Sequence, residues 1–444
     1  MQVATPKKGY KLVKTSFGKY EEIPEEWEIT KLSTICKKPI SGSRPAGGVG
    51  TINEGIPNLG GEHISADGTF NFSKTKFVPK SFFDNSGESK IKTSDILVVK
   101  DGATTGRVAF VDEKFPFQNS MINEHIFILR TKDEINPKWL FYFIFSKLGQ
   151  DQIKIVFQGS AQGGINTSFV NLFHVFIPTY PEQKQIASIL SNVDDTIQKT
   201  DKIIKQTQRL KKGMMQKLLT RGIGHTKFKK VKWYFGKEVE IPEEWELNIL
   251  AEYTTKIGSG ITPRGGSKVY KQSGIPLIRS QNVQFDGITF KDIAYITQEI
   301  HDKMSRTKLQ DFDVLLNITG ASLGRCTFLP ENFGEGNVSQ HVCIIRTKNN
   351  LNHEFLSRFL SSYYGQKVIF TMQNGATKEG LNFEQIKSFK IPLPPLSEQQ
   401  QIASILSNVD TQIQKEKLHK SNLEQLKKGL MQKLLTGQIR VKVP

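Results

Sequence analysis

The stretch Gln185-Ile-Ala-Ser-Ile-Leu-Ser-Asn-Val-Asp194 occurs twice in this chain, because residues 401–410 repeat it without a change. The two copies begin 216 positions apart (401 minus 185). A second stretch, Leu210–Thr220, returns as Leu426–Thr436 with one difference in eleven positions. A period this long indicates tandem domains rather than a solenoid, whose repeated units span about 20–50 residues.

A third repeated stretch precedes the other two in each copy. Tyr10–Glu28 aligns with Phe228–Glu246 and is identical to it at 13 of 19 positions, and both contain the motif Ile-Pro-Glu-Glu-Trp-Glu. Between the repeated stretches the two copies diverge, which predicts one scaffold that presents two different recognition surfaces. The predicted boundaries are a lead-in at 1–22, a first body at 23–178, a central helix at 179–222, a linker at 223–240, a second body at 241–394, a C-terminal helix at 395–437 and a tail at 438–444.

The closing segment of each copy has apolar residues at helical spacing. Thr179–Glu182 and Ser397–Gln400 have the spacing of capping boxes, and Gly222 and Gly437 can end the helices in the left-handed conformation. Each helix would contain about 40 residues and extend about 60 Å. A single helix would expose its apolar stripe, so the two are expected to pack together, antiparallel. The stripe residues expected at this interface, which would also dock partners, are Ile186, Ile189, Val193, Ile197, Leu210, Met214, Leu218, Ile402, Ile405, Val409, Ile413, Leu426, Leu430 and Leu434.

The two bodies have the pattern of mixed α/β (α+β) domains. Short apolar strands are expected in both, and each body then has a short aromatic-rich helix. The predicted fold is therefore two globular domains separated by two long antiparallel helices that form a coiled-coil-like spacer, with a pseudo-two-fold repeat. The expected elements are strands at 95–100, 108–111, 125–130, 313–317 and 341–346, and helices at 137–148 and 353–364.

Composition indicates a polyanionic partner. The net charge is +18, which favours nucleic acid. From Thr196 to Lys232 there are twelve Lys and Arg residues and one acid, Asp201, so this segment is expected to form a phosphate-binding or partner-binding surface. Three cysteines do not make a disulfide framework, and the longest apolar run, Trp139–Phe145, is far too short to cross a membrane. The N-terminus lacks the apolar region of a secretory signal. These features predict a soluble protein of a reducing compartment.

Two glycine-containing loops follow expected strands and share their spacing. Lys100–Arg107 and Asn317–Arg325 each contain two glycines and end in arginine. Glycine permits close backbone approach, and Thr, Ser, Asn and Arg can contact bases or phosphates, but the same spacing also suits a structural hairpin turn. Both interpretations stay open. The candidate DNA-binding residues are Arg44, Lys100, Thr104, Thr105, Arg107, Arg264, Lys268, Arg279, Ser322 and Arg325.

Catalytic motifs are not found. Gly260–Lys268 has the wrong order for a phosphate-binding P-loop and is better explained as a glycine turn. Glu182-Gln-Lys184 has no lysine in its repeat and is better explained by helix capping than by a nuclease metal site. Cys326 and Cys343 lack the pairing of zinc ligands and are expected inside the strand core. We expect no catalytic, cofactor or metal site in this chain.

The repeated helices and their flanking motifs resemble the specificity subunit of type I restriction–modification enzymes. The resemblance rests on Glu182–Asp194 with Glu398–Asp410, on Leu210–Thr220 with Leu426–Thr436 and on the two Ile-Pro-Glu-Glu-Trp-Glu motifs, and it covers essentially the whole chain. It implies two target-recognition domains, each reading one half of a bipartite, asymmetric sequence in double-stranded DNA, and two helices that fix the gap between the halves. It also implies docking of two methyltransferase subunits and of motor–nuclease (restriction) subunits. S-adenosylmethionine, ATP and Mg²⁺ would bind to those partners, in the cytoplasm of a prokaryote.

One local departure and two alternatives accompany this resemblance. The joint Ile177–Glu182 is two residues shorter than Ile391–Glu398, so the first domain–helix joint is expected to differ in angle. A self-contained restriction–modification or nuclease polypeptide is one alternative, but it would need a cofactor or metal motif. A coiled-coil scaffold with two carbohydrate- or protein-binding heads is the other, which the basic charge disfavours.

Overall fold

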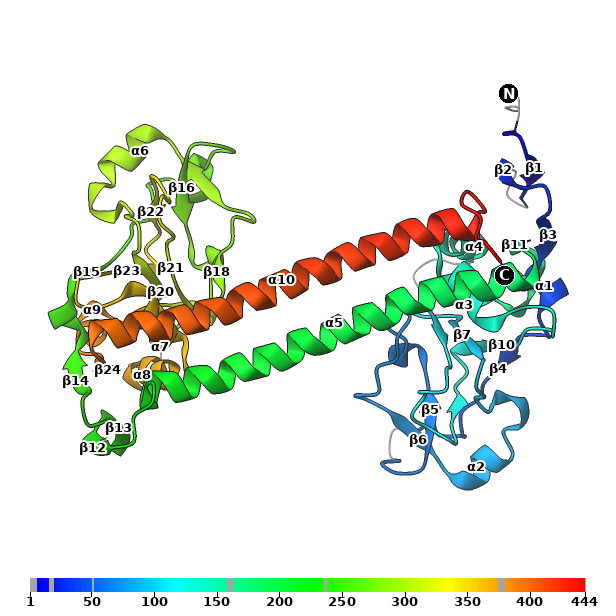
Figure 1. Ribbon diagram of the computed structural model, residues 1–444, viewed down its shortest axis with the longest axis horizontal. Coiled ribbons are helices and arrows are strands. Elements are labelled where there is room, and N and C mark those ends of the chain that lie inside the picture. Colours follow the sequence, from blue (N-terminus) through cyan, green and yellow to red (C-terminus); the bar gives the residue numbers. More distant parts are fainter. Residues whose placement is uncertain are drawn as a thin grey trace. The chain divides into compact units, whose positions relative to one another are not determined.

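The computed structural model describes residues 6–15, 20–49, 52–157, 163–234, 238–373 and 380–443. The chain divides into two compact units, one formed by Met1–Thr200 with His419–Pro444 and the other by Asp201–Leu418 (Figure 1). Each unit therefore contains one body, one end of α5 (Tyr180–Arg221) and the opposite end of α10 (Leu396–Leu435). The repeated tripeptides Phe17-Gly18-Lys19 and Phe235-Gly236-Lys237 lie outside the described residues.

The first body is organised around a four-stranded antiparallel sheet with the order β4-β10-β7-β8. Its two central strands, Ile96–Val99 and Ile126–Leu129, are continuous apolar runs because every one of their side chains is buried. A three-stranded sheet (β6-β5-β9) and two strand pairs (β11-β3 and β1-β2) complete the body. The strands are β1 (Tyr10–Lys14), β2 (Tyr20–Pro24), β3 (Glu28–Lys31), β4 (Ile40–Ser41), β5 (Ile56–Leu59), β6 (Lys76–Val78), β7 (Ile96–Val99), β8 (Val108–Phe110), β9 (Met121–Ile122), β10 (Ile126–Leu129) and β11 (His174–Ile177).

The second body has the same plan, with the four-stranded order β15-β23-β20-β21 and a three-stranded sheet β19-β16-β22. Further pairs are β14-β24, β12-β13 and β17-β18. The strands are β12 (Phe228–Lys232), β13 (Glu238–Pro242), β14 (Glu246–Ile249), β15 (Thr254–Ser259), β16 (Ile275–Ile278), β17 (Val283–Gln284), β18 (Gly287–Ile288), β19 (Ala294–Ile296), β20 (Val314–Asn317), β21 (Cys326–Phe328), β22 (Asn337–Val338), β23 (Val342–Thr347) and β24 (Lys390–Leu393). The predicted strands are confirmed to within one or two residues.

Each aromatic-rich helix predicted from the sequence is two helices rather than one. The prediction of single helices at 137–148 and 353–364 is wrong, because a first helix ends and a second begins at Ser146 and at Ser362. Each serine hydroxyl accepts from the amide of a glycine three residues later and so caps a new helix. The helices of the bodies are α1 (Leu32–Ile35), α2 (Lys80–Asp84), α3 (Pro137–Phe145), α4 (Lys147–Val156), α6 (Gln298–Lys303), α7 (His353–Ser361), α8 (Tyr363–Met372) and α9 (Phe383–Lys387). Short 3₁₀ turns are η1 (Gly61–His63), η2 (Gly87–Ser89), η3 (Thr167–Asn171), η5 (Leu250–Tyr253), η6 (Gly266–Val269), η7 (Ser280–Asn282), η8 (Ser305–Thr307) and η9 (Gly320–Ser322).

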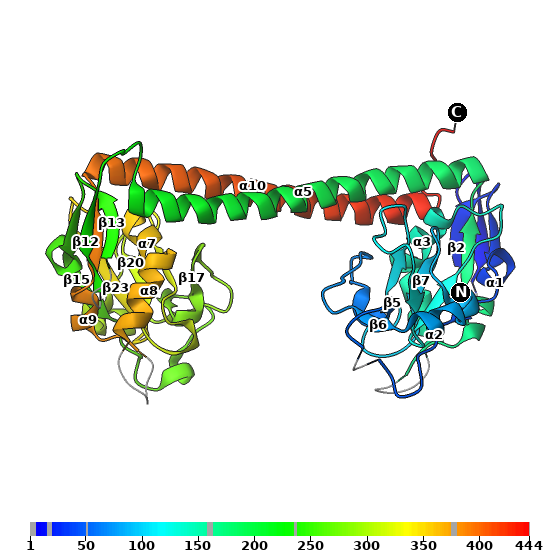
Figure 2. The same ribbon diagram turned by 90° about the horizontal axis from the view of Figure 1, so that it is seen from below.

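The long helices lie side by side and antiparallel within each unit (Figure 2). In the first unit, Ile186 and Leu190 of α5 share a core with Met431 and Leu434 of α10 and with the body. In the second unit, Leu219 shares a core with Ile402 and Leu406 of α10. Burying such a side chain contributes about 1.5–3 kcal/mol, so the helices stabilise the bodies as well as one another. Helix lengths of 42 and 40 residues agree with the predicted length.

The expected stripe residues differ in their exposure. Twelve of the fourteen residues are buried or half-buried, whereas Leu210 and Leu426 are 58% and 51% exposed. These two leucines occupy equivalent positions in the repeat, so the deviation is a shared property of the scaffold. Both helices end at glycines with positive φ, +64° at Gly222 and +72° at Gly437, as predicted.

The Trp and Glu of the repeated motifs contact each other where each body joins its long helix, which explains why both residues occur in both copies. Trp27 Nε1 donates to Glu182 Oε2 at 3.2 Å, and Trp245 Nε1 donates to Glu398 Oε2 at 3.0 Å. A nitrogen-bearing side chain that follows the end of the other helix completes each joint. Arg440 Nε donates to Glu182 Oε1 at 2.7 Å, and His225 Nε2 lies 3.0 Å from Glu398 Oε1.

Two predictions about these joints are wrong. Ile177 pairs with Glu28 and Leu393 pairs with Glu246, so strand register makes Ile177 equivalent to Leu393, not to Ile391. The two joints therefore have the same length. In addition, α10 begins at Leu396, which places Ser397 inside the first turn rather than at the N-cap. The cap predicted at Thr179 agrees with its amide donating to Glu182 Oε2 at 3.4 Å.

Candidate nucleic-acid interface

Three loops of the first body meet at one end of the four-stranded sheet. β4 and β7 end there and β10 begins there, because β10 is antiparallel to both of them. The loop that leaves β4 passes very close to the turn before β10, since a Cβ on Gly42 would lie 2.1 Å from Ile122 O. We call the residues of Ser41–Gly48, Lys100–Arg107 and Asn123–His125 the first loop cluster.

His125 is at the centre of the charged side chains of the first loop cluster. Its Nδ1 contacts a carboxylate oxygen of Asp101, and its Nε2 lies 3.4 Å from Glu124 Oε1. The same Glu124 oxygen lies 3.0 Å from Arg44 Nε. Lys100 Nζ donates to Ser41 Oγ at 3.2 Å. Two cations, Arg44 and Lys100, and two carboxylates, Asp101 and Glu124, thus lie with one imidazole at this end of the sheet.

The second body has an equivalent second loop cluster, formed by Ser259–Lys268, Asn317–Arg325 and Ser339–His341. A Cβ on Gly260 would lie 1.6 Å from Val338 O, so this loop makes the same close approach as Gly42. His341 occupies the place of His125, but its neighbours are neutral. Thr319 Oγ1 lies 2.7 Å from His341 Nδ1, and Gln340 Nε2 lies 3.3 Å from His341 Nε2. The backbone arrangement of the loops is therefore repeated in the second body, whereas the side chains that contact the histidine differ.

The two loops singled out in the sequence are hairpin turns between β7 and β8 and between β20 and β21. Their glycines have positive φ, for example +86° at Gly106 and +85° at Gly324. Arg107 Nη1 donates to Ile64 O at 3.0 Å, and Arg325 Nη1 donates to Gln284 Oε1 at 3.2 Å. Both arginines are half-buried, and their hydrogen bonds connect each hairpin to the rest of its own body. These contacts support the structural interpretation, and contact with DNA stays a prediction for both residues.

The other candidate residues are distributed around these clusters. Arg44 is 62% exposed at its side chain. Arg264 and Lys268 are exposed on the loop after Gly260, and Thr104, Thr105 and Ser322 are half-buried in the hairpins. Arg279 donates to Asp292 O at 2.7 Å and stacks on Tyr270, outside both clusters.

Sequence reasoning missed Asp101, Glu124 and His125, with their equivalents Thr319, Gln340 and His341. A signal was present, because the two histidines lie 216 positions apart, the spacing of the perfectly repeated helix motif (341 minus 125). From the sequence alone, both histidines are expected only at the starts of strands. Their role as the centre of a cluster depends on which loops the sheet brings together.

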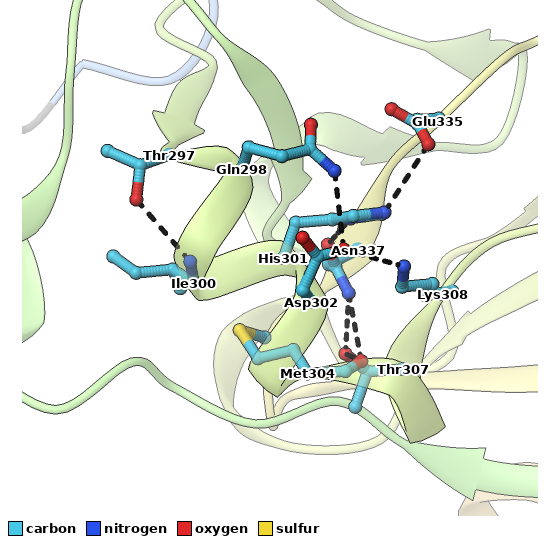
Figure 3. Close-up of polar contacts among 10 residues, drawn as sticks. All are labelled: Thr297, Gln298, Ile300, His301, Asp302, Met304, Thr307, Lys308, Glu335 and Asn337. Atoms are coloured by element: carbon cyan, nitrogen blue, oxygen red, sulfur yellow. Dashed lines mark hydrogen bonds and ion pairs between the residues drawn. The ribbon is translucent and has the colours of Figure 1, made fainter.

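A second difference between the bodies lies below the surface. In the second body, His301 Nδ1 is 2.6 Å from Asn337 Oδ1, and Asn337 Nδ2 donates to Thr307 Oγ1 at 2.8 Å (Figure 3). Glu335 Oε1 lies 3.7 Å from His301 Nε2. At the equivalent places the first body has Phe83 and Met121, which share an apolar cluster. One scaffold therefore accepts a polar or an apolar pair at this position.

Features of other functional classes are sparse in the described part of the chain. No group of three or more His, Cys, Asp or Glu side chains there is arranged to hold a metal ion. Cys326 and Cys343 are buried in the strand core, as expected, and burial raises the pKa of both thiols to about 12. Among the described helices, none is long and apolar enough to cross a membrane.

Comparison with known proteins identifies the repeated unit. The family model described as type I restriction modification DNA specificity domain matches the chain twice, over residues 24–209 and 242–425. The chain belongs to this family. It is a type I restriction–modification specificity subunit with two target-recognition domains, which confirms the resemblance and the predicted fold class. Specificity subunits are the non-catalytic members of these systems, in agreement with the expectation that this chain is not an enzyme by itself.

The relatives of this specificity subunit match along most of their length. The type I restriction enzyme MjaVIII specificity subunit of Methanocaldococcus jannaschii is 30% identical over 433 residues, which are 95% of this chain and 94% of the relative. The MjaIX specificity subunit of the same organism is 23% identical, with 96% of each chain covered. The crystal structure of the type I restriction–modification system S subunit from M. genitalium has a TM-score of 0.56 at 16% identity, covering 92% of this chain and 96% of that one. That likeness shows a shared fold.

Proposed function

We propose that this specificity subunit reads a bipartite, asymmetric sequence in double-stranded DNA, one half with each target-recognition domain. The observation that carries this proposal is the pair of equivalent loop clusters. Their frames agree down to the close approach of Gly42 and Gly260, yet carboxylates at Asp101 and Glu124 are replaced by Thr319 and Gln340. Two sites with one geometry and different hydrogen-bonding groups suit the reading of two different base sequences.

The long helices, in this proposal, set the distance between the two half-sites and dock two methyltransferase subunits. Half-sites one helical turn apart lie about 34 Å from centre to centre, which is well within the length of a helix of about 60 Å. Lys and Arg side chains between Thr196 and Lys232 give the surface of α5 and the following linker a strong positive charge, which suits phosphates or an acidic partner. Leu210 and Leu426 add exposed apolar contacts.

Catalysis then belongs to the partners. The methyltransferase subunits would bind S-adenosylmethionine and the motor–nuclease subunits would bind ATP and Mg²⁺, whereas this chain would bind none of them. The complex would act in the prokaryotic cytoplasm, where its DNA is.

The test is an exchange of one body in a reconstituted methyltransferase complex. Residues 23–178 are replaced by the corresponding body of a relative, and the methylated sequence is determined in cells that carry each version. We expect one half of the methylated sequence to change while the other half stays the same. The reciprocal exchange of residues 241–394 is the control and should change the other half. A change of both halves in either exchange would contradict independent reading by two domains.

A further inference from the structure

Arg44 is the exposed cation of the first loop cluster that is held in a fixed direction. Its contact with Glu124 Oε1, at 3.0 Å, is made through Nε. That contact leaves the Nη1–Nη2 edge of the planar guanidinium for a second, bidentate partner. Because the side chain is 62% exposed, this edge is within reach of a ligand at the surface.

Glu124 is itself fixed from the other side. Its Oε1 also lies 3.4 Å from His125 Nε2, and His125 is held through Nδ1 by Asp101. The row Asp101–His125–Glu124–Arg44 thus runs from the end of β7 to the loop after β4. A side chain that is oriented before binding loses less conformational entropy on binding, so this row prepares Arg44 for a directional contact.

The charge of the first loop cluster argues against a simple phosphate site. Arg44 and Lys100 are matched in number by Asp101 and Glu124, and the third cation of the cluster, Arg107, is half-buried and donates to Ile64 O in its own body. A phosphate is bound best by uncompensated positive charge, whereas a base edge needs donors in a defined direction. Arginine donating to O6 and N7 of guanine is the commonest such contact.

The second loop cluster lacks this arrangement. Gln340 and Thr319 stand where Glu124 and Asp101 stand, so neither position supplies a carboxylate. Arg264 follows Pro263, whereas Arg44 precedes the equivalent Pro45. The held arginine is therefore a property of the first domain alone.

We propose that Arg44 reads a guanine in the half-site bound by the first target-recognition domain, with Glu124 as its positioning residue. This inference rests on the proposed function and deepens it, since it assigns one base of one half-site to one side chain. Loss of a bidentate contact costs about 1–3 kcal/mol, which corresponds to about 5- to 150-fold in discrimination against the other bases at that position.

The experiment compares R44A, R44K and E124Q chains in complex with the methyltransferase partner. Each complex selects from DNA in which the first half-site is randomised and the second is constant. Glutamine occupies the equivalent position 340 in the same fold, so E124Q should leave thermal unfolding unchanged. The K38A chain, which loses one exposed cation just before β4, is the matched charge control.

We expect the wild-type and K38A complexes to require guanine at one position of the first half-site. R44A, R44K and E124Q should lose that preference while keeping the second half-site. If R44K keeps the preference, or if R44A weakens all sequences alike, Arg44 holds a phosphate and the inference is overturned. If E124Q keeps full discrimination while R44A loses it, Glu124 is not the positioning residue. A wild-type complex without any sequence preference would overturn the proposed function and this inference together.

Discussion

Lys427 Nζ lies 2.6 Å from Asp194 Oδ1 in the first unit, and this ion pair joins the two repeated helix motifs of the chain. Lys427 belongs to the Leu-Lys-Lys-Gly motif of α10, and Asp194 ends the perfectly repeated motif of α5. The second unit contains the reciprocal pair, Lys211 with Asp410. Each motif therefore recurs because it contacts the other motif of the opposite helix.

Removing the two lysines separately should have unequal effects. Asp194 also accepts from Tyr142 Oη at 2.8 Å, whereas Asp410 is also paired with the cation Arg358. Lys427→Ala leaves Asp194 with a neutral partner, so we expect a loss of about 1–2 kcal/mol in the stability of the first unit. Lys211→Ala should cost the second unit about 0.5–1 kcal/mol, because Arg358 still compensates Asp410.

Hydrogen exchange read by mass spectrometry resolves the two units and measures both losses. Asp194→Asn combined with Lys427→Ala is the control, since it removes the uncompensated charge and should recover part of the stability. Equal losses in the two units would contradict the role assigned to Arg358.

The buried pair His301 and Asn337 can be tested against the apolar pair of the first body. Each single substitution, His301→Phe or Asn337→Met, leaves a buried polar partner unsatisfied and should cost about 1–3 kcal/mol. The double substitution copies Phe83 and Met121 of the first body and should cost less than the sum of the two single changes by at least about 1 kcal/mol. Chemical denaturation of the four proteins measures this coupling, and additive costs would show that the two sites are not interchangeable.

Arg107 and Arg325 should act on stability rather than on base preference. Each fastens a hairpin to its own body, so replacement by Ala should lower the stability of that unit by about 0.5–1.5 kcal/mol. The sequence selected by the methyltransferase complex should stay unchanged. A relaxed base position in either variant would instead assign that arginine to DNA reading.

The purified chain by itself should neither methylate nor cut DNA. The sequence has no motif for a cofactor, a nucleotide or a nuclease metal, and the family is the non-catalytic one. Incubation with labelled S-adenosylmethionine and plasmid DNA measures both activities. Methyl transfer that persists after the removal of co-purifying subunits would contradict this prediction.

The gap between the half-sites should follow the length of the helices. Four residues inserted after Thr200 add about 6 Å to α5 and turn its apolar stripe by only about 40°, so packing can survive. A matching insertion after Glu416 restores the register of α10 along α5. We expect the spacer to lengthen by about one to two base pairs at 3.4 Å each, with both half-sites unchanged. Methylome sequencing measures the gap, and full activity with an unchanged gap would show that another part of the complex sets it.

The sequence by itself determined the architecture of this protein. The 216-residue repeat in Gln185–Asp194 and Gln401–Asp410 indicated two units, and its helical periodicity predicted two long helices that pack antiparallel. Periodicity is a local property of the chain, and a perfect repeat leaves little freedom in interpretation. The same pattern failed at Leu210 and Leu426, because at this level of each helix the next residue, Lys211 or Lys427, faces the partner helix and pairs with Asp410 or Asp194.

Only the tertiary structure decided the joints and the candidate interface. The Ile-Pro dipeptides align Ile177 with Ile391, but strand pairing shows that Ile177 is equivalent to Leu393. The two joints therefore have the same length. His125 meets Asp101, Glu124 and Arg44 because antiparallel strands bring three distant loops to one end of a sheet. The same geometry turned Arg107 toward Ile64 in its own body. The spacing of residues along the chain does not predict such contacts. They depend on strand register and on the direction of the side chains in the folded protein.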